Sequence, residues 1–345
     1  MRYTFVSFLI FCLIVFFSIV SCSNSKNELS WGKYSESELE FHPFYITPLL
    51  GTPYSINVID SILIIADKVE DKSLLLYNMG DSSYVRTLSI GNGPGEIIFP
   101  IDVNVSIQRK CINAFLRQTG ELRVYPLDSL LKDVTSKYER VNLGLADRGM
   151  QMSEGYVALG LYEDGLLRFY NKDGSLKQKV NLYAEYGIDN VSDLYRLFQG
   201  LLSFNVLNER LAIAPSFASN VLFYHYVDGR WEEYRNFQVG DGSFEEKILN
   251  RSDLRIHNDD IKQSIFICSD KEYFYLLYDG NRMDGDQKKN YRSILCFDAL
   301  TCELKHVYKV DSTVCSICVN DGKMYALFIG RDGEYTVGVA TLSGL

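Results

Sequence analysis

The chain lacks the features by which several protein classes are recognised. It has only seven prolines in 345 residues and no low-complexity run, so no linker between domains is predicted. Its formal net charge of −9 gives no basic excess, which argues against a nucleic-acid partner. The motifs G-x-S-x-G, H-E-x-x-H and the P-loop are absent, and no stretch of the body sustains a helical period beyond a few turns. These absences favour an all-β chain without a recognisable catalytic motif.

One long apolar run is present, and it is confined to the N-terminus. Arg2 precedes an almost wholly apolar stretch at residues 5–20, which ends at Ser21-Cys22 before a polar sequence that starts with Ser23. A charged start, an apolar middle and a small residue before the cut are typical of a signal peptide. The ending resembles a bacterial lipobox, which implies cleavage before Cys22, acylation of its thiol and an outer-membrane position, facing the periplasm or the outside. The alternative is an uncleaved anchor, although a spanning helix needs about 18–20 apolar residues.

The remaining chain is predicted to form one domain behind a tether. Residues 1–21 are the predicted signal peptide, and residues 22–38, rich in Ser, Asn, Lys and Glu, are the predicted flexible tether. Residues 39–345 are the predicted folded body. The chain is 47% hydrophobic and 13% aromatic, which is ample for a large core.

The body repeats a pair of short, β-rich apolar runs separated by a polar loop. The pairs are residues 61–66 with 74–78, 111–116 with 122–125, 156–161 with 166–170, 210–214 with 221–226, 273–278 with 293–297, and 323–329 with 335–340. In the first four pairs a tyrosine stands at or near the end of the second run: Tyr77, Tyr125, Tyr170 and Tyr224. These tyrosines lie 45 to 54 residues apart. Four-stranded units of this length indicate propeller blades.

A third run follows each of the first five pairs, and its absence from the sixth predicts how the ring closes. These runs are residues 84–90, 138–143, 176–182, 231–239 and 304–310. The sixth unit stops at Leu345, whereas the run at residues 39–47 has no partner nearby. We therefore predict that residues 39–47 complete the last blade, so that no sheet edge stays open at the seam.

Two segments resemble a known family. Ser89-Ile-Gly-Asn-Gly-Pro-Gly-Glu96, followed by Pro100, resembles the G-x-G-P-G-E…P signature that links blades in six-bladed propellers of the NHL and TolB-like kind. Lys323-Met-Tyr-Ala-Leu-Phe-Ile-Gly-Arg331 resembles the last-blade strand of TolB-like propeller lipoproteins from Gram-negative bacteria. The resemblance implies an all-β chain with a single six-bladed β-propeller closed by an N-terminal strand. The glycine signature occurs only once, so no NHL activity is implied.

Six cysteines belong to the predicted body: Cys111, Cys268, Cys296, Cys302, Cys315 and Cys318. Cys315 and Cys318 form a C-x-x-C, but they lie in an alternating run. Positions three apart on a strand point to opposite faces, so these two thiols should diverge. The six are predicted to be small buried hydrophobic residues. Whether any of them forms a disulfide in an exported chain is left open by the sequence.

Propellers bind ligands with loops on one face, around the central channel. The loops inside each strand pair and the links between blades carry both acids and arginines, and Glu96, Arg117, Arg148 and Arg331 are the predicted ligand anchors. The tyrosines at strand ends are predicted to pack between blades rather than to stack on sugars. No catalytic residue, metal site or cofactor is predicted. His257, beside two aspartates, is the histidine best placed for acid–base chemistry.

Two functions remain open. The first is a non-catalytic binding module, anchored through Cys22 and monomeric in its body, that recruits an envelope protein, a peptide or a glycan. The alternative is a propeller hydrolase or lyase, assisted by a divalent metal or not. An enzyme should gather two or more carboxylates and a histidine on the channel. A binding module should show an apolar patch with scattered polar anchors.

Overall fold

The structure is a computed structural model that describes residues 34–99, 101–250, 254–283, 292–311, 313–330 and 332–344. Cys22 and Arg331 lie outside the described residues. The same is true of the predicted signal peptide and of residues 22–33 of the predicted tether. Across the described part of the chain, no helix has both the length and the apolarity needed to cross a bilayer.

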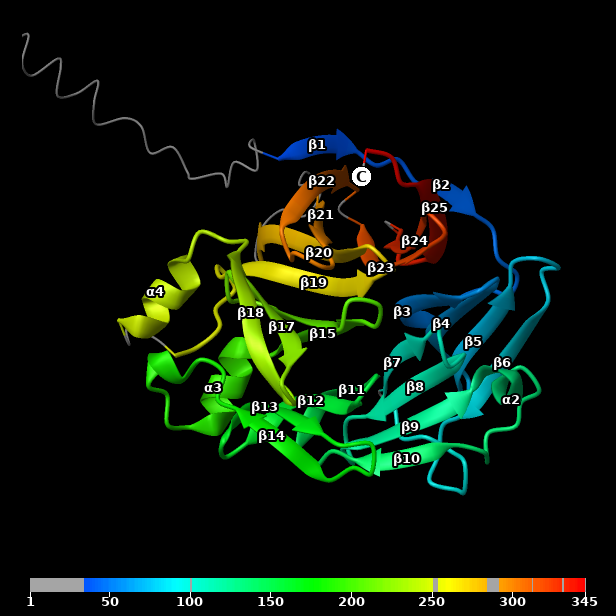
Figure 1. The fold of residues 1–345 in the computed structure, drawn as a ribbon. Helices are drawn as coiled ribbons and strands as arrows, with labels where there is room; N and C mark the ends of the chain where they lie inside the picture. The colour runs from blue at the N-terminus through cyan, green and yellow to red at the C-terminus, as the bar shows by residue number, and fades with distance from the viewer. Residues whose placement is uncertain are drawn as a thin grey trace, which may run out of the picture. The chain divides into compact units, whose positions relative to one another are not determined.

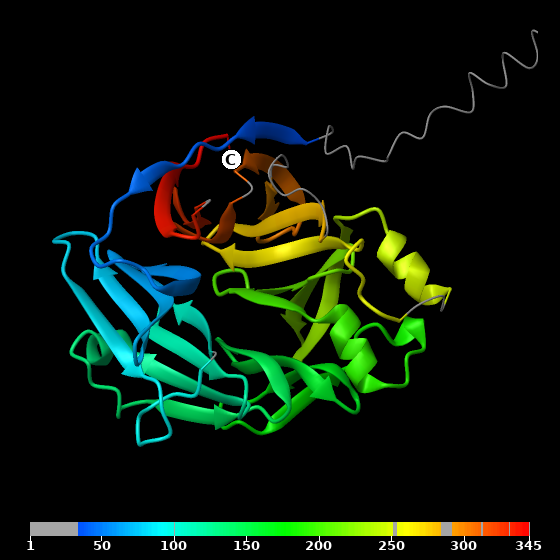
Figure 2. The same ribbon diagram turned by 180° about the vertical axis from the view of Figure 1, so that it is seen from behind.

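Six sheets, antiparallel apart from one parallel edge strand, follow one another around a central axis (Figure 1), so the predicted six-bladed propeller is confirmed. Within each blade the strands follow chain order from the channel outward, except that β1 and β2 from the N-terminus lie at the outer edges of the fifth and sixth sheets (Figure 2). Blade 1 consists of β3 (Thr52–Ile59), β4 (Ile62–Val69), β5 (Lys72–Asn78) and β6 (Tyr84–Ser89). Blade 2 consists of β7 (Ile101–Ser106), β8 (Cys111–Leu116), β9 (Glu121–Pro126) and β10 (Glu139–Asn142). Blade 3 consists of β11 (Ala146–Met152), β12 (Gly155–Tyr162), β13 (Gly165–Tyr170) and β14 (Leu176–Val180).

The other three blades complete the ring. Blade 4 consists of β15 (Gly200–Asn205), β16 (Arg210–Pro215), β17 (Asn220–Val227) and β18 (Arg230–Gln238). Blade 5 consists of β19 (Ile261–Ser269), β20 (Tyr273–Arg282), β21 (Arg292–Asp298) and β22 (Leu304–Val310). Blade 6 consists of β23 (Val314–Asn320), β24 (Lys323–Ile329) and β25 (Tyr335–Thr341). Short helical segments lie in the loops: α2 (Leu127–Leu130), η1 (Ala184–Tyr186), α3 (Val191–Phe198) and α4 (Ser243–Leu249).

The strands are buried on both faces, and this explains why the apolar runs in the sequence are nearly continuous. Along β4, Ile64 packs in a cluster with Ile112 of blade 2, while its neighbour Ile65 packs with Leu327 of blade 6. Because successive side chains of a strand point to opposite faces, each blade buries one set of residues against the blade before it and another against the blade after it. The tyrosines at the strand ends are buried, which confirms their predicted packing role.

The N-terminal run completes the last blade as predicted. Within it, β2 (His42–Phe44) pairs antiparallel with β25, which would otherwise be the open edge of blade 6. The Phe44 ring packs edge-on against Tyr77 of blade 1, at 6.3 Å, and Tyr325 of blade 6, at 5.9 Å. Phe44 therefore joins the first and last blades at the seam of the ring.

The predicted tether is too long at its C-terminal end. Ser35–Glu38 form β1, which pairs in parallel with β22 at the outer edge of blade 5. Ser37 Oγ lies 2.8 Å from Nε2 of His306, a buried residue of β22. The polar composition of residues 35–38 suggested a solvated linker, but backbone pairing at a sheet edge does not require apolar side chains. The folded body therefore begins before residue 39.

Replacing Gly155 by alanine tests the packing between strands of blade 3. Gly155 has a φ of +123°, and an added Cβ would lie 1.9 Å from the carbonyl oxygen of Tyr170. We expect the substitution to lower the free energy of unfolding by about 2–4 kcal/mol, because steric overlap adds to backbone strain. Gly229→Ala is the control, since its φ of +85° is strained but no heavy atom lies within 4 Å. Urea denaturation measures the free energy of unfolding of both variants, and an equal decrease in the two would contradict this explanation.

Candidate functional site

The channel is lined by the innermost strand of every blade. The first halves of these strands, with residues such as Asp102 of β7 and Arg148 of β11, surround a cavity at one end. The second halves, with residues such as Val105 of β7 and Met150 of β11, surround a cavity at the other end. The first end adjoins the links between blades and the loops inside each strand pair. The second end adjoins the turns that lead from each innermost strand to the next strand.

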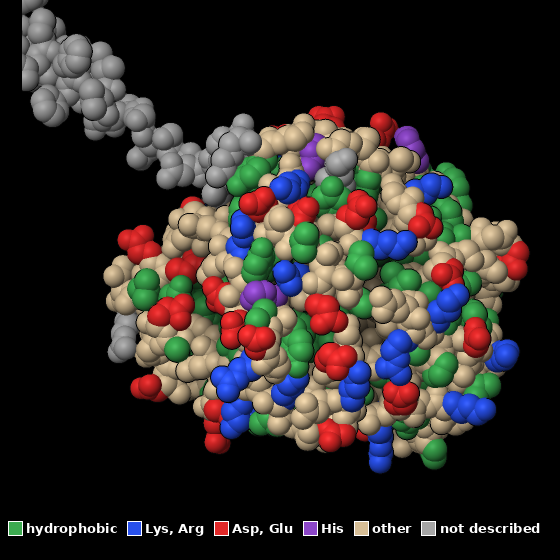
Figure 3. Space-filling model, viewed as in Figure 1, with side chains coloured by type: hydrophobic (Ala, Val, Ile, Leu, Met, Phe, Trp, Pro, Cys, Tyr) green, Lys and Arg blue, Asp and Glu red, His purple; other side chains and the backbone are tan. Residues whose placement is uncertain are grey.

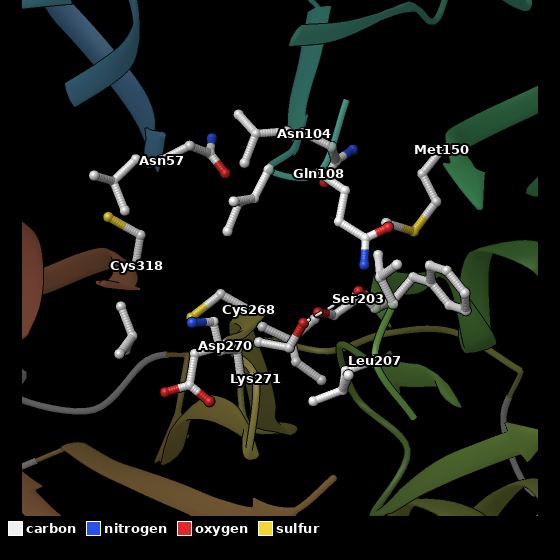
Figure 4. A pocket seen from close by; sticks show the side chains of 18 of the residues that line it. Asn57, Asn104, Gln108, Met150, Ser203, Leu207, Cys268, Asp270, Lys271 and Cys318 are labelled. Carbon is white, nitrogen blue, oxygen red and sulfur yellow. Dashed lines mark hydrogen bonds between the residues drawn. The ribbon is translucent and has the colours of Figure 1, made fainter. Parts of the chain in front are cut away.

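The cavity at the second end, the apolar mouth, has a volume of about 230 Å³. Its wall combines apolar side chains with a few amides and hydroxyls (Figure 4). The apolar part comprises Val58, Val105, Ile107, Met150, Phe204, Val206, Leu207, Phe266, Ile267, Cys268, Cys318 and Val319. The polar part comprises Asn57, Asn104, Gln108, Ser203, Ser269, Asp270 and Lys271. Figure 4 shows Gln108 and Cys268 approaching the cavity from opposite sides.

Two large apolar side chains stand exposed at the rim of the apolar mouth. Ile107 is 44% exposed and Leu207 is 64% exposed, each in a turn that follows an innermost strand. The buried side chain of Asn205 fixes the second turn, because its oxygen accepts from the Asn208 backbone N–H at 2.8 Å. Its amide donates to the carbonyl oxygen of Asp270 at 2.6 Å, in the corresponding turn of blade 5. One side chain thus joins two turns that form the rim.

The thiols in the apolar mouth act as apolar groups. Burial raises the pKa of Cys268 and of Cys318 above the usual range of a thiol, so both stay protonated at neutral pH. All six cysteines of the body are free thiols in the structure. Cys111, Cys296, Cys302 and Cys318 are buried as predicted, whereas Cys268 and Cys315 are only partly buried.

A polar groove of about 450 Å³ continues from the apolar mouth across blades 2 and 3. The two cavities share Val105, Gln108, Met150, Phe204 and Val206. In the groove, Gln151 Oε1 and Ser153 Oγ are buried and have no hydrogen-bond partner within the described part of the chain. Buried polar atoms normally have a partner, and the residues that carry these two atoms line the groove.

The cavity at the first end of the channel, the charged pocket, brings two predicted anchors together. Arg117 binds Asp102 through both Nε, at 2.9 Å, and Nη2, at 2.7 Å, and Arg148 Nη1 donates to the same carboxylate. Arg148 Nε also lies 3.6 Å from Asp147 Oδ2. Burial raises the pKa of the Asp102 carboxyl to about 6, and the Arg117 guanidinium opposes that rise. The sequence did not single out Asp102, although it connects the two arginines.

The other predicted site residues lie elsewhere. Glu96 accepts a hydrogen bond from the Gly93 backbone N–H at 2.7 Å and lines none of the cavities described above. Arg331 and Cys22 lie outside the described residues, so their roles stay predictions. His257 also lines none of these cavities, and its backbone N–H donates to Asp260 Oδ2 at 2.7 Å. Among the described residues, no group of three or more His, Cys, Asp or Glu is arranged to hold a metal ion.

The surface carries charges of both signs. On the face shown in Figure 3, acidic and basic side chains are interspersed rather than separated into fields of one sign. A mixed surface of this kind is typical of a solvated protein.

Comparison with known proteins identifies the family. Residues 38–322 match the family described as TolB-like 6-blade propeller-like. The chain belongs to this family. The match covers most of the propeller, from the end of β1 to the turn after β23, and it includes residues 89–96, so the predicted family is confirmed. Residues 323–331 lie beyond the matched region, and the resemblance of that segment stays a prediction. No curated protein matches the chain in sequence.

Solved structures share the fold of this TolB-like propeller at low sequence identity. A protein of Bacteroides fragilis described as exported matches with a TM-score of 0.56 and 13% identity, over 89% of this chain and 95% of that chain. A member of the DUF4221 family from Bacteroides vulgatus has a TM-score of 0.55 and 11% identity, over 88% of this chain and 98% of that chain. A luciferin-regenerating enzyme has a TM-score of 0.53 and 12% identity, over 89% and 96%. At such identities these likenesses show the fold alone.

Proposed function

We propose that this TolB-like propeller is an exported, non-catalytic binding module, held at the outer membrane through lipid on Cys22. Its apolar mouth receives an apolar side chain of an envelope polypeptide, and the polar groove receives the adjoining backbone. The observation that carries the proposal is the combination of the two cavities. An apolar cavity with a few polar groups is the usual form of a ligand site. A polar groove that extends from it suits an elongated ligand.

The chemistry of the lining favours a polypeptide over a glycan. A sugar ring is recognised by exposed aromatic faces, whereas the described wall of the apolar mouth contains only Phe204 and Phe266 as aromatic residues, and Phe204 is buried. A polypeptide backbone offers amide N–H donors at regular intervals. The acceptors Gln151 Oε1 and Ser153 Oγ in the groove are suited to such donors.

The channel does not provide the arrangement expected of a hydrolase. No histidine is among the described residues that line the apolar mouth, the polar groove or the charged pocket. In the apolar mouth, the Asp270 carboxylate is already engaged by the Glu272 and Tyr273 backbone N–H groups, at 2.9 and 2.8 Å. These observations support binding in preference to acid–base catalysis.

Export and anchoring are supported by the N-terminal sequence. The order of charge, apolar run and small residue before Cys22 resembles that of a lipoprotein signal. The protein of Bacteroides fragilis with the same fold is described as exported. The mature chain would carry its lipid about a dozen residues before β1 begins at Ser35, which leaves room between the bilayer and the propeller.

Replacing Leu207 by aspartate tests the apolar mouth. Intact cells would be treated with a crosslinker, and the protein captured through a C-terminal tag for mass spectrometry. A charge at the rim must be desolvated when an apolar side chain enters, so we expect the captured partner to fall at least about 10-fold, the change that 1.4 kcal/mol produces. Burial of the Leu207 side chain by the partner contributes to the same effect.

Leu300→Asp is the matched control. Leu300 is 57% exposed, a fraction similar to the 64% of Leu207. It lies in the turn between β21 and β22 and does not line the cavity. Its replacement should leave capture unchanged. A partner that Leu207→Asp retains, or that both variants lose equally, would contradict binding at the apolar mouth.

A further inference from the structure

The charged pocket lies at the opposite end of the channel from the apolar mouth and differs from it in chemistry. It has a volume of about 220 Å³, and the polar residues of its wall are Tyr54, Ser55, Asp102, Asn104, Arg117 and Arg148. These side chains come from blades 1, 2 and 3. Convergence of three blades on one small cavity places their polar groups within reach of a single ligand.

Two hydroxyl groups in the charged pocket have no partner within the described chain. Ser55 is only 6% exposed, and its Oγ is buried without a hydrogen bond. The Tyr54 hydroxyl is also buried without a partner, while its ring packs edge-on against Phe99 at 5.6 Å. Burial and the negative charge of Asp102 raise the Tyr54 pKa, so this hydroxyl keeps its proton. Both groups can therefore donate a hydrogen bond to a ligand.

The charges in the wall favour an anion. Both oxygens of Asp102 already accept hydrogen bonds from Arg117 and Arg148. Each guanidinium has five N–H donors, so each keeps donors beyond those used on Asp102. The side chains of Arg117 and Arg148 remain 31% and 21% exposed. The residues that line the pocket carry two positive charges and one negative charge, which a ligand of charge −1 balances. Asp147 lies outside the lining, 3.6 Å from Arg148 Nε, and offsets part of the positive charge.

We propose that the charged pocket binds a carboxylate, with Arg117 and Arg148 supplying the charge and the Ser55 hydroxyl a further hydrogen bond. A carboxylate is planar and singly charged, and it accepts paired N–H bonds from guanidinium groups. The carboxylate comes either from a small free acid or from the C-terminus of a polypeptide. The charged pocket adjoins the apolar mouth at Asn104, Phe266 and Ile267, but Ser55, Arg117 and Arg148 do not line the mouth. The proposal does not depend on what that mouth binds.

The affinity for a carboxylate should rise as the pH falls. The titratable and charged groups that face Asp102 are Tyr54 on β3, Arg117 after β8, Asp147 and Arg148 on β11, and Tyr195 on α3. Burial raises the pKa of Tyr195. The Asp102 pKa is raised to about 6, so protonation below that pH removes the negative charge from the wall. In the limit that the ligand binds only when Asp102 is protonated, the dissociation constant falls by about 25-fold between pH 7.5 and 5.5.

The test uses three probes on the purified propeller, with dissociation constants from titration calorimetry. Propionate represents a free acid, N-acetyl-leucine represents a polypeptide C-terminus, and N-acetyl-leucinamide lacks only the charge. We expect one or both acids to bind and the amide not to bind. Arg148→Gln should raise the dissociation constant of the acid that binds by about 10-fold or more. Arg168→Gln is the matched control, because Arg168 is also paired with an aspartate and is 23% exposed outside the pocket.

Ser55→Ala gives a second test that does not disturb the ion pairs. Because the Ser55 hydroxyl has no partner, its removal should leave the unfolding midpoint unchanged. It should raise the dissociation constant of the acid by about 3- to 10-fold. Ser73→Ala is the control, since the buried Ser73 hydroxyl donates to Leu88 O at 2.9 Å and should affect stability alone. Equal binding of the acid and the amide, no binding of either acid, or full affinity in Ser55→Ala would overturn the proposal. Should Arg148→Gln fail to fold, Ser55→Ala decides.

Discussion

Replacing Cys22 by alanine is expected to move the protein from the membrane fraction to the soluble fraction of the cell envelope. Acyl chains on the Cys22 thiol and on the new N-terminus are the only lipid attachment that the sequence predicts. Several chains together give stable anchoring, whereas a single chain gives only marginal binding. Without them, the mildly acidic body has no basic patch predicted to hold it on an anionic surface. Fractionation followed by detection of a C-terminal tag measures the change.

Cys111→Ala is the control for cysteine loss, because Cys111 is a buried thiol of β8. This variant should stay in the membrane fraction. Persistent attachment of Cys22→Ala would contradict lipidation. It would favour the uncleaved apolar anchor at residues 5–20 instead.

Removing the N-terminal strand that closes the ring should cause the largest loss of stability. A mature chain that begins at residue 48 lacks β2, which leaves the edge of β25 unpaired. It also lacks the Phe44 ring that packs on Tyr77 and Tyr325. We expect the free energy of unfolding to fall by about 3 kcal/mol or more, the usual cost of removing a packed phenylalanine side chain. An exposed strand edge should also promote aggregation. Urea denaturation and light scattering measure the two effects.

A chain that begins at residue 39 provides the control. It loses β1, a four-residue strand at the outer edge of blade 5, but keeps β2 and the Phe44 ring. Its free energy of unfolding should fall by clearly less than that of the chain that begins at residue 48. Equal stability of the two truncated chains would show that β2 does not close the ring energetically.

The repeat made the fold predictable from the sequence. Strand pairs recur at blade spacing, and most of the apolar residues in their runs are buried because each blade packs on two neighbours. The unpartnered run at residues 39–47 and the missing last strand of the sixth unit together predicted the closure. The strand β1 was missed because its four polar residues pair through backbone alone, which leaves no apolar pattern to detect.

The candidate sites were less predictable, because they depend on residues that are distant in the sequence. Arg117 and Arg148 were chosen as loop arginines, but the alternating strand around Asp102 gave no reason to expect the carboxylate that joins them. The apolar mouth was missed because function was expected at the links and the loops inside each strand pair. A signal was present: Ile107 and Leu207 are large apolar residues in turns where solvent favours polar ones.

The central claim is that a polypeptide enters the channel at the apolar mouth. The most direct measurement places a photoreactive amino acid at position 207 or at position 300 in intact cells and identifies what is attached after illumination. Binding at the apolar mouth predicts that one envelope polypeptide attaches at position 207 and not at position 300, through a segment that contains an apolar side chain. Attachment at position 300 in equal amount, or no polypeptide at position 207, would contradict the claim.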